Sequence, residues 1–169
     1  YPEIIRLIKE SGYKNVNFFG AAPDSMESAI SRPQDLVIAA PNSSNFDLIR
    51  EYPDYLMHFK KEGMDALFAQ EKAVLEGASK YVAEKGILIY TINTLSKKEG
   101  HMTITDFLAN HPEFHLNKEV QTYPFEDMQT TLYYAVMVKD TKAAKKAAPL
   151  GDVASLNNSE PAQISASEK

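Results

Sequence analysis

Residues 36 to 46, LVIAAPNSSNF, form an apolar run that stops at Pro41 and continues as a short polar loop. An uninterrupted apolar run is typical of a strand that is buried in a parallel sheet. Ligands of open α/β sheets bind beyond the carboxyl ends of the strands, so the loop with Asn42, Ser43 and Ser44 is a candidate site. The alternative is an ordinary strand-to-helix connection whose polar residues form turns and caps.

Helical and strand-like patterns alternate on both sides of this stretch. The periodicity predicts helices over 2–11, 63–86 and about 104–108, and strands over 15–19, 36–40, 87–92 and 131–139. This alternation indicates an α/β fold with three layers and a mostly parallel sheet. Because the order opens with a helix, we expect the first strands of such a sheet to precede residue 1.

The composition narrows the class of protein. The 169 residues are 44% hydrophobic and 24% charged, which is typical of one globular domain. No apolar run approaches the roughly 20 residues of a membrane span, so we expect an intracellular protein without a membrane partner. The absence of cysteine excludes disulfides, cysteine-ligated zinc and a thiolate nucleophile.

The last residues differ in composition from the rest. Residues 141–169 hold four lysines, three acidic residues and no aromatic residue, which gives this segment a net charge of +1. Since the whole chain has a net charge of −5, residues 1–140 have a net charge of −6. This composition predicts a domain over 1–140 and a disordered tail over 141–169. The alternative is a contact with RNA or an acidic partner through the lysines of this region, which are Lys139, Lys142, Lys145 and Lys146.

Several segments occur in the order found in one enzyme family. These are RPQDLVIAAPNSS (32–44), FAQEKAVLEGASKYVAEKGILIYTINT (68–94), FLANHPEFHL (107–116) and LYYAVMVK (132–139). In this order they resemble the carboxyl-terminal half of the Sun-type (NOL/NOP/Sun) ribosomal RNA cytosine-C5 methyltransferases, over about residues 4–139. The resemblance implies part of a Rossmann-like fold for S-adenosylmethionine-dependent methyl transfer, with ribosomal RNA as partner.

The resemblance also implies where the chemistry of the family would lie. Members add a cysteine thiolate to carbon 6 of the cytosine, and a second cysteine assists product release. The two matching positions are Asn42 and Asn93, and the matching active-site loop includes Ala39 and Pro41. Since asparagine cannot form a comparable nucleophile, the sequence predicts a methyltransferase-like domain that does not catalyse.

Other functional positions of the family have also changed. The aspartate that helps to position the target base falls on Ala39, and the carboxylate near the adenosine falls near Ala21 or Ala22, with Asp24 the nearest acid. S-adenosylmethionine is therefore implied by the family but has no assigned residues here. We expect no metal site, because the four histidines lack ligand spacing: His58, His101, His111 and His115.

Three hypotheses follow from these patterns. The first is a non-catalytic module that binds ribosomal RNA or the ribosome, or a protein that completes the sheet. The second is an active methyltransferase fragment whose cofactor-binding half lies upstream or on another chain. The third is a truncated or divergent product without a selected function.

Overall fold

The structure is a computed structural model that describes residues 2–20, 22, 25–26, 29–58, 60–123 and 131–144. Its helices are α1 (Pro2–Ser11), α2 (Lys61–Ser79), α3 (His101–Asn110) and α4 (Thr141–Ala144), with 3₁₀ turns at Phe46–Arg50 and Pro53–His58. Its strands are β1 (Gln34–Ala39), β2 (Val82–Ile92), β3 (Phe114–Gln121) and β4 (Tyr133–Lys139). Asp24, the acid nearest the family's adenosine position, lies outside the described residues.

The four strands form a mixed sheet in the order β1-β2-β4-β3. β1 pairs with β2 in parallel, with Ala39 opposite Tyr90, whereas β4 is antiparallel to both β2 and β3. Three of the strands run in one direction and β4 runs against them between β2 and β3. The predicted α/β fold thus has a mixed sheet, with one parallel and two antiparallel pairs among the described strands. Because β1 and β2 are parallel neighbours, their carboxyl ends lie next to each other at the same end of the sheet.

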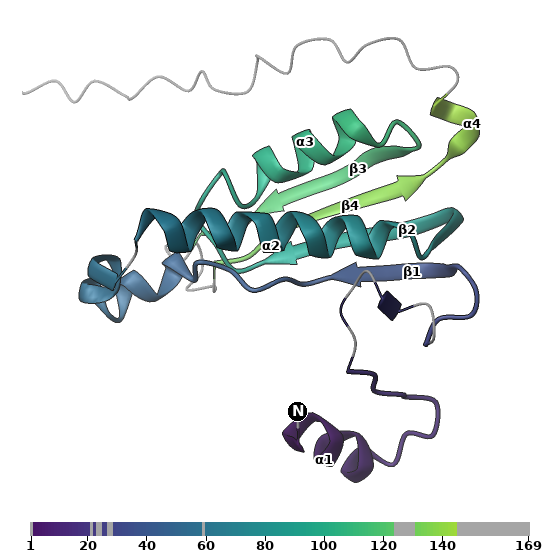
Figure 1. The fold of residues 1–169 in the computed structure, drawn as a ribbon, viewed down its shortest axis with the longest axis horizontal. Helices are drawn as coiled ribbons and strands as arrows, with labels where there is room; N and C mark the ends of the chain where they lie inside the picture. The colour runs from purple at the N-terminus through teal and green to yellow at the C-terminus, as the bar shows by residue number, and fades with distance from the viewer. Residues whose placement is uncertain are drawn as a thin grey trace, which may run out of the picture.

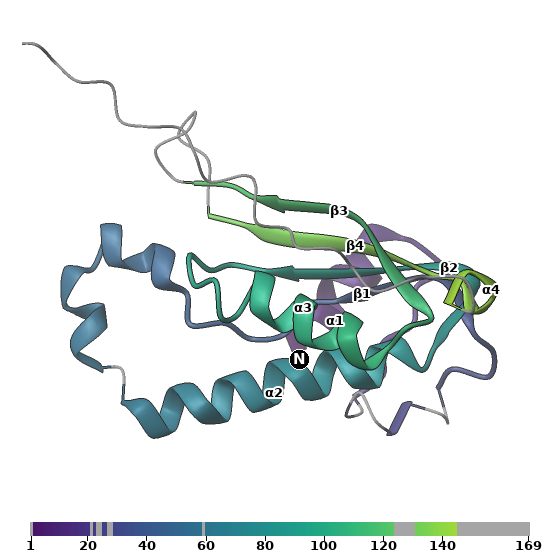
Figure 2. The ribbon, with the colours of Figure 1, turned by 90° about the horizontal axis from the view of Figure 1, so that it is seen from above.

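Two helices, α2 and α3, cover one face of this sheet (Figures 1 and 2). Alternate side chains of β2 and β4 point into the interface, where Leu88, Tyr90, Ala135 and Met137 have no exposed surface. The helices contribute apolar side chains to the same core, which are Leu75, Ile104 and Phe107. This alternation makes one face of the sheet the inside of the domain.

The opposite face of the sheet is open at β1. Leu36 and Ile38 are 53% and 59% exposed, and their neighbour Ile87 on β2 is 37% exposed. Among the described residues β1 pairs with β2 alone, so it is an edge strand. The expectation of a strand buried on both faces is thus wrong in this chain, and the described residues form two of the three predicted layers.

The first segment of the chain forms a helix but not the predicted strand. α1 begins and ends as its apolar pattern predicts, and Gly12 follows it with a φ of +71°. α1 buries none of its residues, and it lies beyond the β1 edge (Figure 1). Residues 15–19 are not a strand. A strand requires a neighbour to complete its backbone hydrogen bonds, and none of the described strands pairs with this segment.

The boundary between α2 and β2 differs from the predicted one. The apolar period suggested a helix up to Gly86, yet α2 ends at Ser79 and β2 begins at Val82. Val82 pairs with Gln34, after which β2 bulges and Lys85 adopts a φ of +65°. Pairing with β1 therefore overrides the helical period, because a strand partner satisfies the backbone groups that a helix would have satisfied.

The end of the chain is described only as far as residue 144. The short helix α4 covers the first four residues of the predicted tail, and residues 145–169 lie outside the described part of the structure. The prediction of a disordered tail therefore stays a prediction. Within the described residues, no helix has both the length and the apolar composition that crossing a membrane requires.

Candidate functional site

The candidate site consists of two loops that leave adjacent parallel strands at the same edge of the sheet. The β1 loop is residues 40–45 and the β2 loop is residues 93–100. Asn42 and Asn93, which the sequence resemblance places at the positions of the family's cysteines, lie one on each loop, and both side chains are exposed. Ala39 ends β1 with its side chain buried, and Pro41 is half-buried.

A buried carboxylate joins these two loops. Glu99 accepts hydrogen bonds from the backbone N–H of Ser44 at 2.7 Å and from the Ser44 hydroxyl at 2.6 Å. The Thr94 hydroxyl also donates to Glu99, and its oxygen lies 3.3 Å from that of Ser44. All three side chains are buried. Ser44 therefore joins the β1 loop to the β2 loop, whereas Ser43 bonds Asn45 within its own loop and Asn42 is exposed.

A second carboxyl group, that of Glu71 on α2, lies beside this contact. Glu71 has no exposed surface, and neither of its oxygens meets a hydrogen-bond donor from the described residues. Burial, and then the neighbouring Glu99 carboxylate, raise the pKa of Glu71 from 4.5 to about 9. The Glu71 carboxyl therefore keeps its proton at neutral pH, which reduces the repulsion between two buried acidic groups.

Two buried tyrosines, Tyr90 on β2 and Tyr133 on β4, lie next to the β2 loop. The Tyr90 hydroxyl donates to the backbone oxygen of Glu99 at 2.9 Å, and its ring meets that of Tyr133 edge-on at 6.3 Å. Burial is the main cause that raises the pKa of each phenol above its ordinary range. Gly100 passes so close to Tyr133 that a Cβ there would lie 2.9 Å from the ring. Both phenols therefore act as neutral packing and hydrogen-bonding groups.

A second set of polar contacts links Tyr133 to β3 and α3. The Tyr133 hydroxyl donates to Glu119 at 2.8 Å, and the same carboxylate oxygen lies 2.9 Å from the ring of His101 at the start of α3. The Gln121 amide donates to the backbone oxygen of Thr94 at 3.0 Å. These contacts fix the β2 loop against β3 and α3.

Sequence reasoning identified the two loops but missed the residues that join them. Ser44 belongs to the candidate loop, whereas Glu99 is not among the candidate site residues. Glu71 has a weak signal: it lies four residues before Leu75, on the apolar side of α2, where a charged residue is unusual. Nothing in the sequence pairs Glu71 with Glu99.

Neither Glu99 nor the two asparagines of the loops supplies a free nucleophile. Both oxygens of Glu99 already accept hydrogen bonds, and an asparagine amide is not a nucleophile under physiological conditions. No three histidine or acidic side chains of the described residues could hold a metal ion together.

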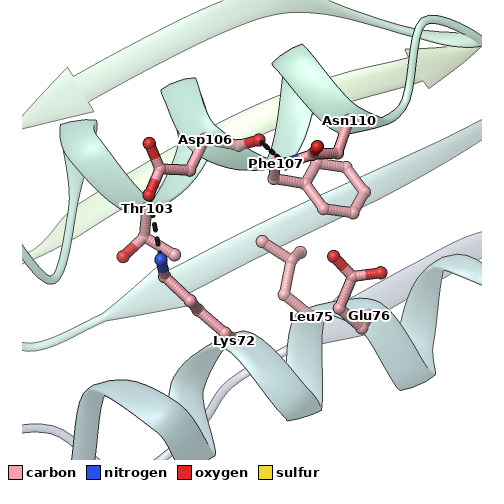
Figure 3. Close-up of a pocket in the computed structure, with 7 residues that line it drawn as sticks. All are labelled: Lys72, Leu75, Glu76, Thr103, Asp106, Phe107 and Asn110. Carbon is pink, nitrogen blue, oxygen red and sulfur yellow. Dashed lines mark hydrogen bonds and ion pairs between the residues drawn. The ribbon is translucent and has the colours of Figure 1, made fainter. Parts of the chain in front are cut away.

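A hollow between α2 and α3 is separate from these loops (Figure 3). Seven residues line it: Lys72, Leu75, Glu76, Thr103, Asp106, Phe107 and Asn110. Lys72 and Asp106 form an ion pair of 2.9 Å across it, and its volume is about 110 Å³. A small-molecule pocket usually has about 300–1,000 Å³, so this hollow is a packing feature between two helices.

Solved structures confirm the fold as part of a Rossmann-like α/β fold. The crystal structure of PH0851 superposes with a TM-score of 0.74 and 22% identity, over 82% of this chain and 34% of its own. NSun6 from Pyrococcus horikoshii superposes with a TM-score of 0.66 and 19% identity, over 82% and 38%. A methyltransferase homologue from the same organism superposes with a TM-score of 0.65 and 14% identity, over 82% of this chain and 49% of its own.

Two relatives confirm the resemblance to Sun-type ribosomal RNA methyltransferases. Ribosomal RNA small subunit methyltransferase B of Thermus thermophilus is 30% identical over 93 residues, which are 49% of this chain and 23% of the relative. Its namesake in Xanthomonas campestris is 32% identical over 77 residues, 46% of this chain and 18% of the relative. The chain thus spans about a fifth of these relatives, and no protein-family model matches it.

Proposed function

We propose that the chain is a non-catalytic RNA cytosine-C5 methyltransferase-like domain that acts as an intracellular RNA- or ribosome-associated module. The proposal rests on Asn42 and Asn93, which the sequence resemblance matches to the family's two cysteines. Both side chains are exposed at the ends of paired parallel strands. A cytosine presented at this edge would meet two amides and no thiolate, so the covalent step has no nucleophile. The names of the relatives, which refer to methylation of ribosomal RNA, support RNA as the partner.

Charge at the same edge supports RNA as the partner. Lys97 and Lys98 are exposed on the β2 loop, and the Lys98 ammonium lies 4.1 Å from the centre of the Phe68 ring. Lysines at this edge could neutralise phosphates, although the chain as a whole is acidic. S-adenosylmethionine has no assigned residues in this chain, so a bound cofactor is not part of the proposed activity.

The test measures binding of small-subunit ribosomal RNA by filter retention. We expect the double variant Lys97→Glu, Lys98→Glu to weaken binding at least tenfold and to flatten its dependence on salt. The control variant is Lys80→Glu. Lys80 is exposed directly after the last residue of α2, and its variant should retain affinity. Unchanged RNA binding by the double variant would contradict this location of the RNA surface.

A further inference from the structure

Two buried carboxyl groups, that of Glu71 on α2 and that of Glu99 on the β2 loop, interact electrostatically. The same part of α2 packs on the β2 loop, where the Lys98 ammonium lies 4.1 Å from the centre of the Phe68 ring. Glu71 and Glu99 have no exposed surface. Two ionised carboxylates in contact inside a protein repel each other strongly, since little solvent screens them. One of the two groups therefore has to be neutral in the folded protein.

Hydrogen bonding identifies the neutral group. Glu99 is a pure acceptor: it receives the N–H and O–H groups of Ser44 and the O–H group of Thr94. Glu71 meets no donor from the described residues, so an ionised Glu71 would have no compensation for its burial. A protonated carboxyl group has an O–H of its own, which can donate to the adjacent Glu99.

We propose that Glu71 holds a proton that it shares with Glu99, and that this pair is a pH-sensitive latch that keeps the β1 loop closed on the β2 loop. While the proton is present, Glu99 stays in place and anchors Ser44. When the proton leaves, repulsion between the two carboxylates displaces Glu99 and releases the β1 loop. Asn42 lies two residues from Ser44, so the edge of the sheet changes shape with protonation.

The other groups around the pair do not replace this proton. Tyr90 faces the pair from β2, but its hydroxyl already donates to the Glu99 backbone. Ser44 and Thr94 do not titrate in this range. No lysine, arginine or histidine of the described residues forms an ion pair with either carboxyl group. The pKa of Glu71, about 9, places the opening above neutral pH.

The inference does not rest on methyl transfer or RNA binding, and it can be tested by loop mobility. The chain has no cysteine, so Asn42→Cys supplies one thiol for a spin label on the β1 loop. We expect a restricted label at about pH 7 that becomes predominantly mobile by about pH 10. Adding Glu71→Gln, whose amide N–H replaces the carboxyl O–H, should keep the label restricted throughout.

A label on Ala73→Cys, at an exposed position of α2, is the control and should not change. Equal mobility at both pH values, or the same change with Glu71→Gln, would overturn the proposal. Isotope-edited infrared spectroscopy of the unaltered chain is a second readout that needs no variant. A protonated glutamate C=O band at neutral pH is expected, and its absence would also overturn the proposal.

Discussion

Ser44 donates two hydrogen bonds to Glu99, one from its backbone at 2.7 Å and one from its hydroxyl at 2.6 Å, although 55 residues separate the two along the chain. Both residues are buried, so the contact is an internal part of the domain. It holds together the two loops that carry Asn42 and Asn93. The arrangement of the two loops at the carboxyl ends of β1 and β2 therefore depends on one carboxylate.

Removal of that carboxylate should destabilise the domain. Glu99→Ala leaves the donors of Ser44 and Thr94 buried without an acceptor, at about 1–3 kcal/mol for each unsatisfied group. We predict that the free energy of unfolding falls by about 3 kcal/mol, measured by urea denaturation. Glu62→Ala, at an exposed position in the first turn of α2, is the control and should change stability by less than about 0.5 kcal/mol. Equal losses in the two variants would argue against a buried anchor.

Stability should fall as the pH rises, because of Glu71. Its carboxyl ionises near pH 4.5 when unfolded but only near pH 9 when folded, so the folded state binds more protons between these values. The free energy of unfolding should therefore decrease across this window, by up to about 1.4 kcal/mol per pH unit for one proton. Glu71→Gln should remove this part of the slope, whereas the exposed Glu62→Gln should keep it. Parallel curves for Glu71→Gln and the unaltered chain would exclude a retained proton.

Two glycines should respond to alanine in opposite directions. At Gly86 a Cβ would lie 2.8 Å from the Ala83 backbone oxygen and 3.1 Å from that of Gln34, so Gly86→Ala should push β1 and β2 apart. We predict a loss of about 2 kcal/mol or more in thermal unfolding. At Gly63, on α2, a Cβ meets no described atom within 4 Å, so Gly63→Ala should stabilise by about 0.5–1 kcal/mol. A harmless Gly86→Ala would mean that the bulge in β2 can relax.

The open edge at β1 should make the isolated chain associate with itself. An exposed edge strand with apolar side chains is a template for pairing with another chain. We expect dimers or larger species by light scattering, and a shift toward monomer with Ile38→Lys. Met57→Lys, at an 85% exposed position outside the sheet, is the control and should not shift it. A monomeric chain that unfolds cooperatively would show that the edge is not a pairing surface.

The sequence was a good guide wherever local pattern and tertiary contacts agree. The apolar runs of β1 and β2 and the carboxyl-end loops were predictable, because strand period and turn residues are local properties. The end of α2 was not predictable, because it depends on the pairing of Val82 with Gln34, which are far apart in the chain. The strand at 15–19 failed for the same reason, because no described strand pairs with it. The Glu71–Glu99 contact arises only when α2 meets the β2 loop.

The central claim is that a methyltransferase fold here lacks the nucleophiles of its relatives. Its most direct test is transfer of a labelled methyl group from S-adenosylmethionine to cytosine of small-subunit ribosomal RNA, with the segment that precedes this region in the related enzymes supplied. The account predicts no 5-methylcytosine above background, because Asn42 and Asn93 cannot attack carbon 6. Methylated cytosine that depends on this protein would contradict it.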